Sequence, residues 1–74
     1  MNPTNEVIEA TEHVKEHYPQ ADILIVTVSG TYAFLDQFLN KVPIDLEVLD
    51  GAVIEKAVES VEGPFMYEHD EYNS

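Results

Sequence analysis

Residues 22–28 read Asp22-Ile23-Leu24-Ile25-Val26-Thr27-Val28, a nearly continuous run of apolar and β-branched side chains. Residues of this kind favour strands, and an unbroken apolar run is typical of a strand that is buried on both faces. Strands of that type occupy the centre of parallel sheets. We therefore expect a central strand here, and we interpret the flanking segments around it.

Both ends of the chain carry an amphipathic helical pattern. Residues 4–18 predict a helix that Thr4 or Asn5 caps and that ends before Pro19, because the residue before a proline avoids the helical region. Residues 51–62 predict another, which starts after Asp50 and stops at Gly63. Each has an apolar face and a face rich in glutamate. These patterns predict two helices with acidic outer sides.

The middle of the chain predicts a further helix and a second strand. Residues 31–41 have apolar side chains over half of a helical circumference, and residues 44–49 alternate apolar with acidic. A strand, a helix and a strand in this order form a right-handed crossover between parallel strands. We therefore expect a small single α/β domain over residues 1–64, in the order α-β-α-β-α with a short parallel sheet, followed by an acidic and aromatic tail over residues 65–74.

The charge of the chain is strongly negative. Fifteen acidic residues face three lysines and no arginine, which gives a formal net charge of −12. Such a surface is a poor partner for nucleic acid or an anionic membrane, and a good one for a basic protein surface. The N-terminus lacks the basic flank and apolar run of a signal peptide, so we expect a cytoplasmic protein.

Glutamates recur every three or four residues along the two amphipathic helices. On a helix this spacing separates carboxylates by roughly 5 to 6 Å, close to the spacing of phosphates along a nucleic-acid strand. A protein built in this way can occupy a groove lined with lysine and arginine. We expect the partner-binding residues to be Glu6, Glu9, Glu12, Glu16, Glu55, Glu59, Glu62, Glu68, Asp70 and Glu71.

Small size, absence of cysteine, high negative charge and acidic helical rows are similar to the class of phage-encoded inhibitors that mimic DNA. The resemblance covers the general character of the whole chain. Glu59-Ser60-Val61 also resembles the acidic-serine-apolar element of uracil-DNA glycosylase inhibitors, although it lies here in a predicted helix. The resemblance implies a non-enzymatic inhibitor in the host cell that covers the DNA-binding surface of a DNA-processing protein, such as uracil-DNA glycosylase, a nuclease, a polymerase or the sliding clamp.

The sliding clamp is the target that one short motif favours. Gln20-Ala21-Asp22-Ile23-Leu24 resembles the pentapeptide by which replication proteins dock on the bacterial clamp, with leucine in place of the usual final phenylalanine. The two apolar residues of the motif also begin the strand that we expect to be buried. A docking role therefore requires that they remain accessible.

Self-association is expected on two grounds. A two-stranded sheet is rarely stable alone, and the predicted helix at 31–41 has more apolar surface than a thin sheet can cover. A homodimer would bury that surface through Tyr32, Phe34, Leu35, Phe38 and Leu39. The alternative function is a regulatory or adaptor protein that binds its partner through the same apolar helix face or through the tail at 65–72.

One stretch has the pattern of a zinc site. His13-Val14-Lys15-Glu16-His17 matches H-x-x-E-H, in which two histidines one turn apart bind zinc and the glutamate activates water. Enzymes of that class are much larger and take a third ligand from a separate helix. The pattern is also that of two surface histidines near a helix C-terminus. We therefore expect no catalytic residue, no metal and no cofactor.

Overall fold

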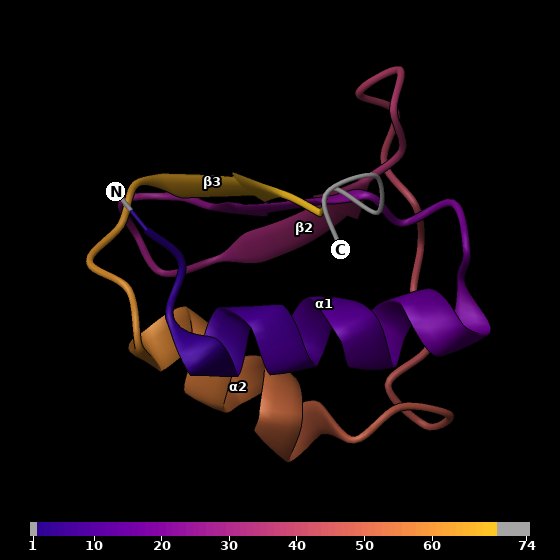
Figure 1. Cartoon of the computed structure of the whole chain (residues 1–74), viewed down its shortest axis with the longest axis horizontal. Coiled ribbons are helices and arrows are strands. Elements are labelled where there is room, and N and C mark those ends of the chain that lie inside the picture. Colours follow the sequence, from indigo (N-terminus) through magenta and orange to yellow (C-terminus); the bar gives the residue numbers. More distant parts are fainter. Residues whose placement is uncertain (1, 70–74) are drawn as a thin grey trace.

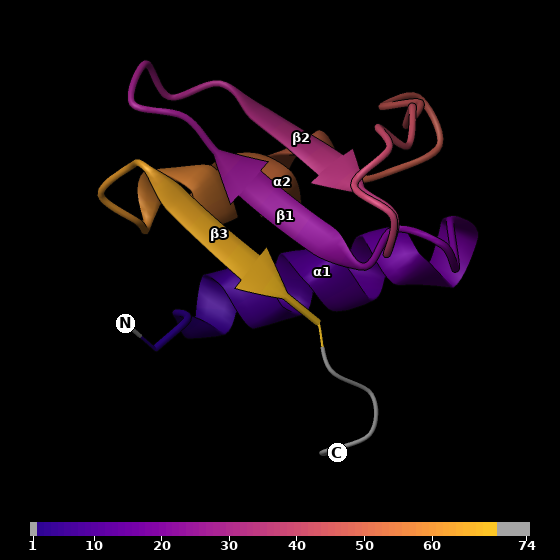
Figure 2. The same ribbon diagram turned by 90° about the horizontal axis from the view of Figure 1, so that it is seen from above.

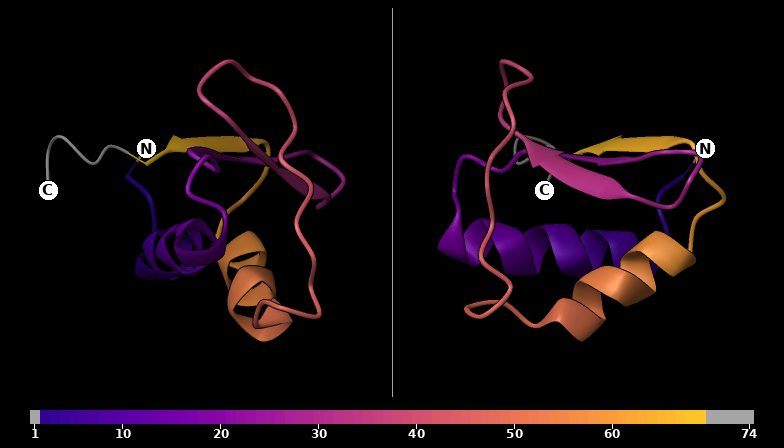
Figure 3. Two further views of the ribbon diagram at one scale, coloured as in Figure 1. Left: turned by 90° about the vertical axis from the view of Figure 1, so that its right-hand side faces the viewer. Right: turned by 180° about the vertical axis from the view of Figure 1, so that it is seen from behind.

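The structure, a computed structural model, describes residues 2–69. Two helices lie side by side on one face of a three-stranded sheet (Figures 1 and 3). In chain order the elements are α1 (Asn5–His17), β1 (Ile23–Val26), β2 (Tyr32–Leu35), α2 (Gly51–Glu59) and β3 (Phe65–Glu68). The prediction of a small single domain that combines helices and strands is confirmed.

The sheet has the order β2-β1-β3, and both pairs of strands are antiparallel (Figure 2). The prediction of a parallel sheet is therefore wrong, although β1 is the central strand as expected. The reason lies in the loop that follows β1, where the Thr27 N–H donates to the Thr31 carbonyl at 2.8 Å. A loop this short joins antiparallel strands, because parallel strands need a long crossover.

The segment 31–41 contains a strand and a hairpin turn, so the helix predicted there is wrong. Beyond β2 the Asp36 carboxylate accepts the N–H groups of Phe38 and Asn40, each at 2.9 Å. The chain then turns back, and Lys41 pairs with Leu35. This hairpin rises on the side of the sheet that faces away from the helices (Figures 1 and 3).

The strand predicted at 44–49 is also wrong, because this segment is a connection ending in a turn. The Asp45 carboxylate accepts the Glu47 N–H at 2.9 Å, and its carbonyl accepts the Val48 N–H at 3.0 Å. These bonds curl the backbone. The predicted tail is wrong in its first part, since Phe65–Glu68 is β3; residues 70–74 lie outside the described residues.

Both predicted amphipathic helices are confirmed, with α2 three residues shorter than expected at its C-terminal end. The two helices are joined by polar contacts at both ends. The Oγ atoms of Thr4 and Ser60 lie 2.6 Å apart, and the Asp50 N–H donates to His13 Nε2 at 2.9 Å. Thr4 is the N-cap of α1 and Asp50 is the N-cap of α2, so these bonds fix the helix starts as well as the helix pair.

The core lies between the helices and the sheet. Alternate residues of the strands point toward the helices, and Leu24 and Phe34 are paired across β1 and β2 with 0% and 2% exposure. The buried apolar side chains that pack together are Val7, Ala10, Val14, Ala21, Leu24, Val26, Phe34, Val42, Leu49, Ile54 and Ala57. The connection between β2 and α2 contributes Val42 and Leu49, which explains why it follows a fixed path without being a strand.

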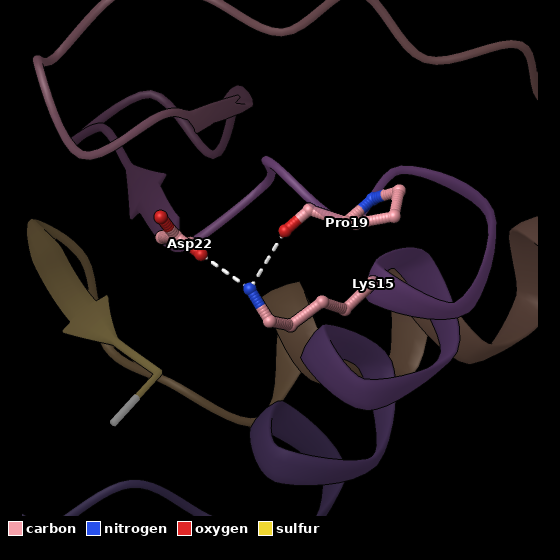
Figure 4. A network of polar contacts seen from close by, with 3 residues as sticks. All are labelled: Lys15, Pro19 and Asp22. Carbon is pink, nitrogen blue, oxygen red and sulfur yellow. Dashed lines mark hydrogen bonds and ion pairs between the residues drawn. The ribbon is translucent and has the colours of Figure 1, made fainter. Parts of the chain in front are cut away.

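A charged contact fixes the end of α1 to the start of β1 (Figure 4). Lys15 Nζ donates to the Pro19 carbonyl at 2.8 Å and to the Asp22 carboxylate, with which it also forms an ion pair. The turn between the helix and the central strand is thereby closed by one side chain.

Candidate functional site

The outward side of the helical layer carries the predicted acidic rows. All four glutamates of α1 and both glutamates of α2 are exposed. Within residues 2–69 none of them takes part in an ion pair. The members of this group, which we call the helical carboxylates, are Glu6, Glu9, Glu12, Glu16, Glu55 and Glu59.

Some of the helical carboxylates border an open groove of about 380 Å³ that lies along α1 and reaches α2 at Val53. Three of them line it together with His13, while the apolar part of its wall includes Ile8 and Val53. The carboxylates that line it are Glu9, Glu12 and Glu16. Among residues 2–69 no lysine lines this groove. A smaller hollow of about 140 Å³ between the helices contains Lys56 beside Glu6, Glu9 and Asp50.

The remaining predicted acidic residues do not lie on the helical layer. Glu62 is exposed in the turn after α2. Glu68 is exposed on β3 and pairs with Ile23, so its side chain belongs to the face of the sheet opposite the helices. Asp70 and Glu71 lie outside the described residues. The structure thus places six of the ten predicted residues on one layer and separates Glu68 from them.

Within residues 2–69 the predicted set omits three exposed carboxylates, which are Asp45, Glu47 and the α2 N-cap Asp50. Asp45 and Glu47 lie in the turn that precedes α2, where they were assigned to the outer side of a strand. The signal that could have identified them as turn residues is the aspartate itself, because its side chain bonds readily to the backbone two residues later.

The five residues predicted to form a dimer interface are not one surface. Phe34 is 2% exposed and belongs to the core. Phe38 and Leu39 are 74% and 64% exposed in the hairpin, while Tyr32 and Leu35 are half-buried on opposite faces of β2. The prediction assumed a helix, and a strand distributes the same residues differently.

Tyr32 also has a perturbed acidity. Burial raises the pKa of its phenol, and the negative charge of Glu55 adds to this increase. The phenol is therefore neutral over a wider pH range than that of a free tyrosine.

The two histidines of the candidate zinc pattern lie in the last turns of α1. His13 and His17 are stacked edge to face with ring centroids 5.9 Å apart, but His13 Nε2 already accepts the Asp50 N–H. Among residues 2–69 no group of three or more metal-binding side chains is arranged to hold an ion. The two apolar residues of the clamp-docking pentapeptide are inaccessible, because Ile23 is 4% and Leu24 is 0% exposed.

The outer edge of β3 is a further surface that the sequence did not suggest. β3 is at the end of the strand order, and its neighbour β1 covers one of its edges only. An apolar groove of about 580 Å³ adjoins this strand and the end of β1. Its lining residues are Ile25, Val26, Thr27, Val28, Pro64, Phe65 and Met66.

Neither helix has the length and apolar character of a membrane span, as far as residues 2–69 show. Comparison with models of protein families, with curated proteins and with solved structures finds no match to this chain.

Proposed function

We propose that this protein is a non-enzymatic inhibitor whose helical carboxylates take the place of DNA on the basic surface of a DNA-processing protein. The observation that carries the proposal is the joint placement of six exposed carboxylates on one layer, without an ion pair to any of them within residues 2–69. Their charge is therefore available to a partner that brings its own lysines and arginines.

The chemistry of such a contact is electrostatic. A basic groove that binds phosphates also attracts carboxylates, and the cations that accompany either kind of anion are released when it binds. Oppositely charged surfaces also accelerate association, and this acceleration falls as salt screens the charges. Binding through the helical carboxylates would therefore compete with DNA and weaken with ionic strength. Uracil-DNA glycosylase, nucleases, polymerases and the sliding clamp are partners of this chemistry.

The test is a competition assay with purified basic DNA-binding proteins, including a bacterial sliding clamp and a uracil-DNA glycosylase. Fluorescence polarisation of labelled DNA reports its displacement by the protein. We expect displacement from at least one of them, with affinity falling about tenfold between roughly 50 and 300 mM salt. Binding that is unaffected by both salt and DNA would contradict the proposal.

A matched pair of triple variants locates the surface. Glu9→Gln, Glu12→Gln and Glu16→Gln remove three charges from the groove side of α1. Asp45→Asn, Glu47→Gln and Glu68→Gln remove the same charge elsewhere, and the asparagine keeps the oxygen that accepts the Glu47 N–H. The first set should abolish most of the displacement and the second should retain it. Equal loss in both would mean that net charge alone governs binding.

The second candidate is an adaptor that binds through apolar side chains, and the exposed hairpin favours it. Phe38 and Leu39 are 74% and 64% exposed at its turn, an unusual place for two large apolar residues. For this function Phe38→Glu would abolish partner binding, while neutralising the glutamates of α1 would leave it intact. The inhibitor proposal predicts the opposite pattern.

A further inference from the structure

Within residues 2–69, one edge of β3 pairs with no other strand. The His69 N–H donates to the Asp22 carbonyl at 2.7 Å, and Tyr67 is in register with Leu24. In an antiparallel pair the hydrogen-bonded residues alternate along the strand, so Tyr67 and His69 direct their backbone groups toward β1. Met66 and Glu68 direct theirs away from it. Within residues 2–69 no backbone group bonds to this outer edge.

We propose that this edge binds an extended segment of a partner protein as a fourth strand of the sheet. Met66 and Glu68 together offer two N–H donors and two carbonyl acceptors, which is the arrangement by which edge strands take up another strand. The segment adds antiparallel to β3. It has a basic residue opposite Glu68 and an apolar residue opposite Met66.

The side chains of β3 select the sequence of the added strand. Residues directly opposite each other in an antiparallel pair share one face of the sheet. Glu68 is exposed and has no ion pair within residues 2–69, so it favours lysine or arginine beside it. Met66 is 63% exposed and lines the apolar groove, so it favours an apolar neighbour. Because the strands are antiparallel, the segment reads basic, any residue, apolar from its N-terminus.

A second copy of this chain fits the edge poorly. Antiparallel pairing of β3 with itself through its outward groups places Glu68 opposite Pro64, Met66 or another Glu68. None of these registers gives the carboxylate a cation, and the last brings like charges together. α1 also lies beneath the β3 side of the sheet, so two joined sheets would bring their acidic helices near each other (Figures 2 and 3).

The inference is independent of the proposed function, because it uses the edge of the sheet and not the helical carboxylates. It is tested by nuclear magnetic resonance on the whole isotope-labelled chain with short synthetic peptides. The first peptide carries arginine, threonine and valine in that order within a run of threonines. A second has the valine and arginine exchanged, and a third carries an N-methyl group on the arginine backbone nitrogen, which removes one donor.

In the free protein we expect the Met66 and Glu68 amides to exchange with solvent about tenfold faster than that of Tyr67, because only the latter is bonded in the sheet. Saturation with the first peptide should slow both of them to the rate of Tyr67. The second and third peptides should bind more weakly. Stronger binding of the exchanged peptide, unchanged affinity on N-methylation, or Met66 and Glu68 amides already protected in the free protein would overturn the inference.

A charge exchange isolates the role of Glu68. Glu68→Gln should weaken the arginine peptide about two- to fivefold, the range of an exposed ion pair. Glu68→Lys should bind a peptide with glutamate in place of arginine better than the original peptide. Glu62→Gln removes the same charge away from the strand and should leave the affinity unchanged. If Glu62→Gln and Glu68→Gln weaken binding equally, net charge explains the effect and the register is wrong.

Discussion

Gly30 has φ +87° in the loop between β1 and β2, and Leu39 has φ 68° in the hairpin after β2. The glycine can be recognised in the sequence, because a glycine between two runs of β-branched or aromatic residues is typical of a β-hairpin loop. The prediction of a helix over residues 31–41 did not take this signal into account. Leu39 has no such signal, since side chains of its kind rarely adopt this conformation, and its geometry follows from the bonds that Asp36 makes around it.

Gly63 is held close to another part of the backbone. A Cβ atom at this position would lie 2.6 Å from the Thr27 carbonyl oxygen, whereas at Gly51 it would meet nothing within 4 Å. We expect Gly63→Ala to lower the free energy of unfolding by about 1 to 3 kcal/mol, because the backbone of one segment must move. Gly51→Ala, in a helix, should be neutral or stabilising. Chemical denaturation of both variants checks this, and equal stability would contradict the close approach.

Elements whose pattern depends on one buried face were predicted correctly. In α1 the spacing of Val7, Ala10 and Val14 matches the buried face, and the carboxylates opposite them are exposed. The helix predicted over residues 31–41 was wrong for a physical reason. The outer face of the sheet is itself apolar, so β2 reads as an unbroken apolar run without the alternation of a half-exposed strand. Its continuation into Phe38 and Leu39 extended the run to helical length.

The candidate surfaces also differ in how far the sequence predicts them. The acidic rows on the helices could be predicted, because charged residues opposite an apolar stripe lie in solvent. The open edge of β3 could not, because it depends on which strands pair. Its four residues mix apolar, aromatic and acidic side chains, and strand pairing between distant segments leaves no local signal.

Substitutions of Phe34 and Phe38 test whether this segment is a strand and hairpin or a helix. Phe34→Ala should lower the free energy of unfolding by about 3 to 5 kcal/mol, because it empties a buried site. Phe38→Ala should change it by less than about 0.5 kcal/mol, as exposed positions do. Thermal and urea unfolding measure both. Similar losses of unfolding free energy in the two variants would mean that Phe38 is packed against other residues, which would contradict its exposed position in the hairpin.

Within residues 2–69 the helical layer is acidic, whereas the outer face of the sheet is mostly apolar. The helical layer carries six of the fifteen acidic residues, while the strands present mostly apolar side chains on their outer face. Like charges gathered on one layer repel each other and oppose the compact state. This arrangement lowers stability in a chain that has only a small core.

Salt should therefore stabilise the protein. We expect the Tm to rise by about 5 °C or more between roughly 20 and 500 mM sodium chloride, because screening shortens the range of the repulsion. The Glu9→Gln, Glu12→Gln and Glu16→Gln variant should be more stable at low salt and gain less from added salt. Differential scanning calorimetry gives both quantities. A Tm that is independent of salt in both proteins would show that the repulsion is negligible.

The strand order carries a kinetic consequence. β1 and β2 are neighbours in the chain and meet through a short loop, whereas β3 reaches β1 only after the hairpin, the connection and α2 have passed. Closing a short loop costs less entropy than closing a long one, so the β1–β2 pair forms early and β3 joins late. The last strand to arrive is the one with the open edge. During folding, the edge of β1 is also unpaired until β3 arrives. The rate at which β3 pairs with β1 then decides whether this edge binds β3 or a neighbouring molecule.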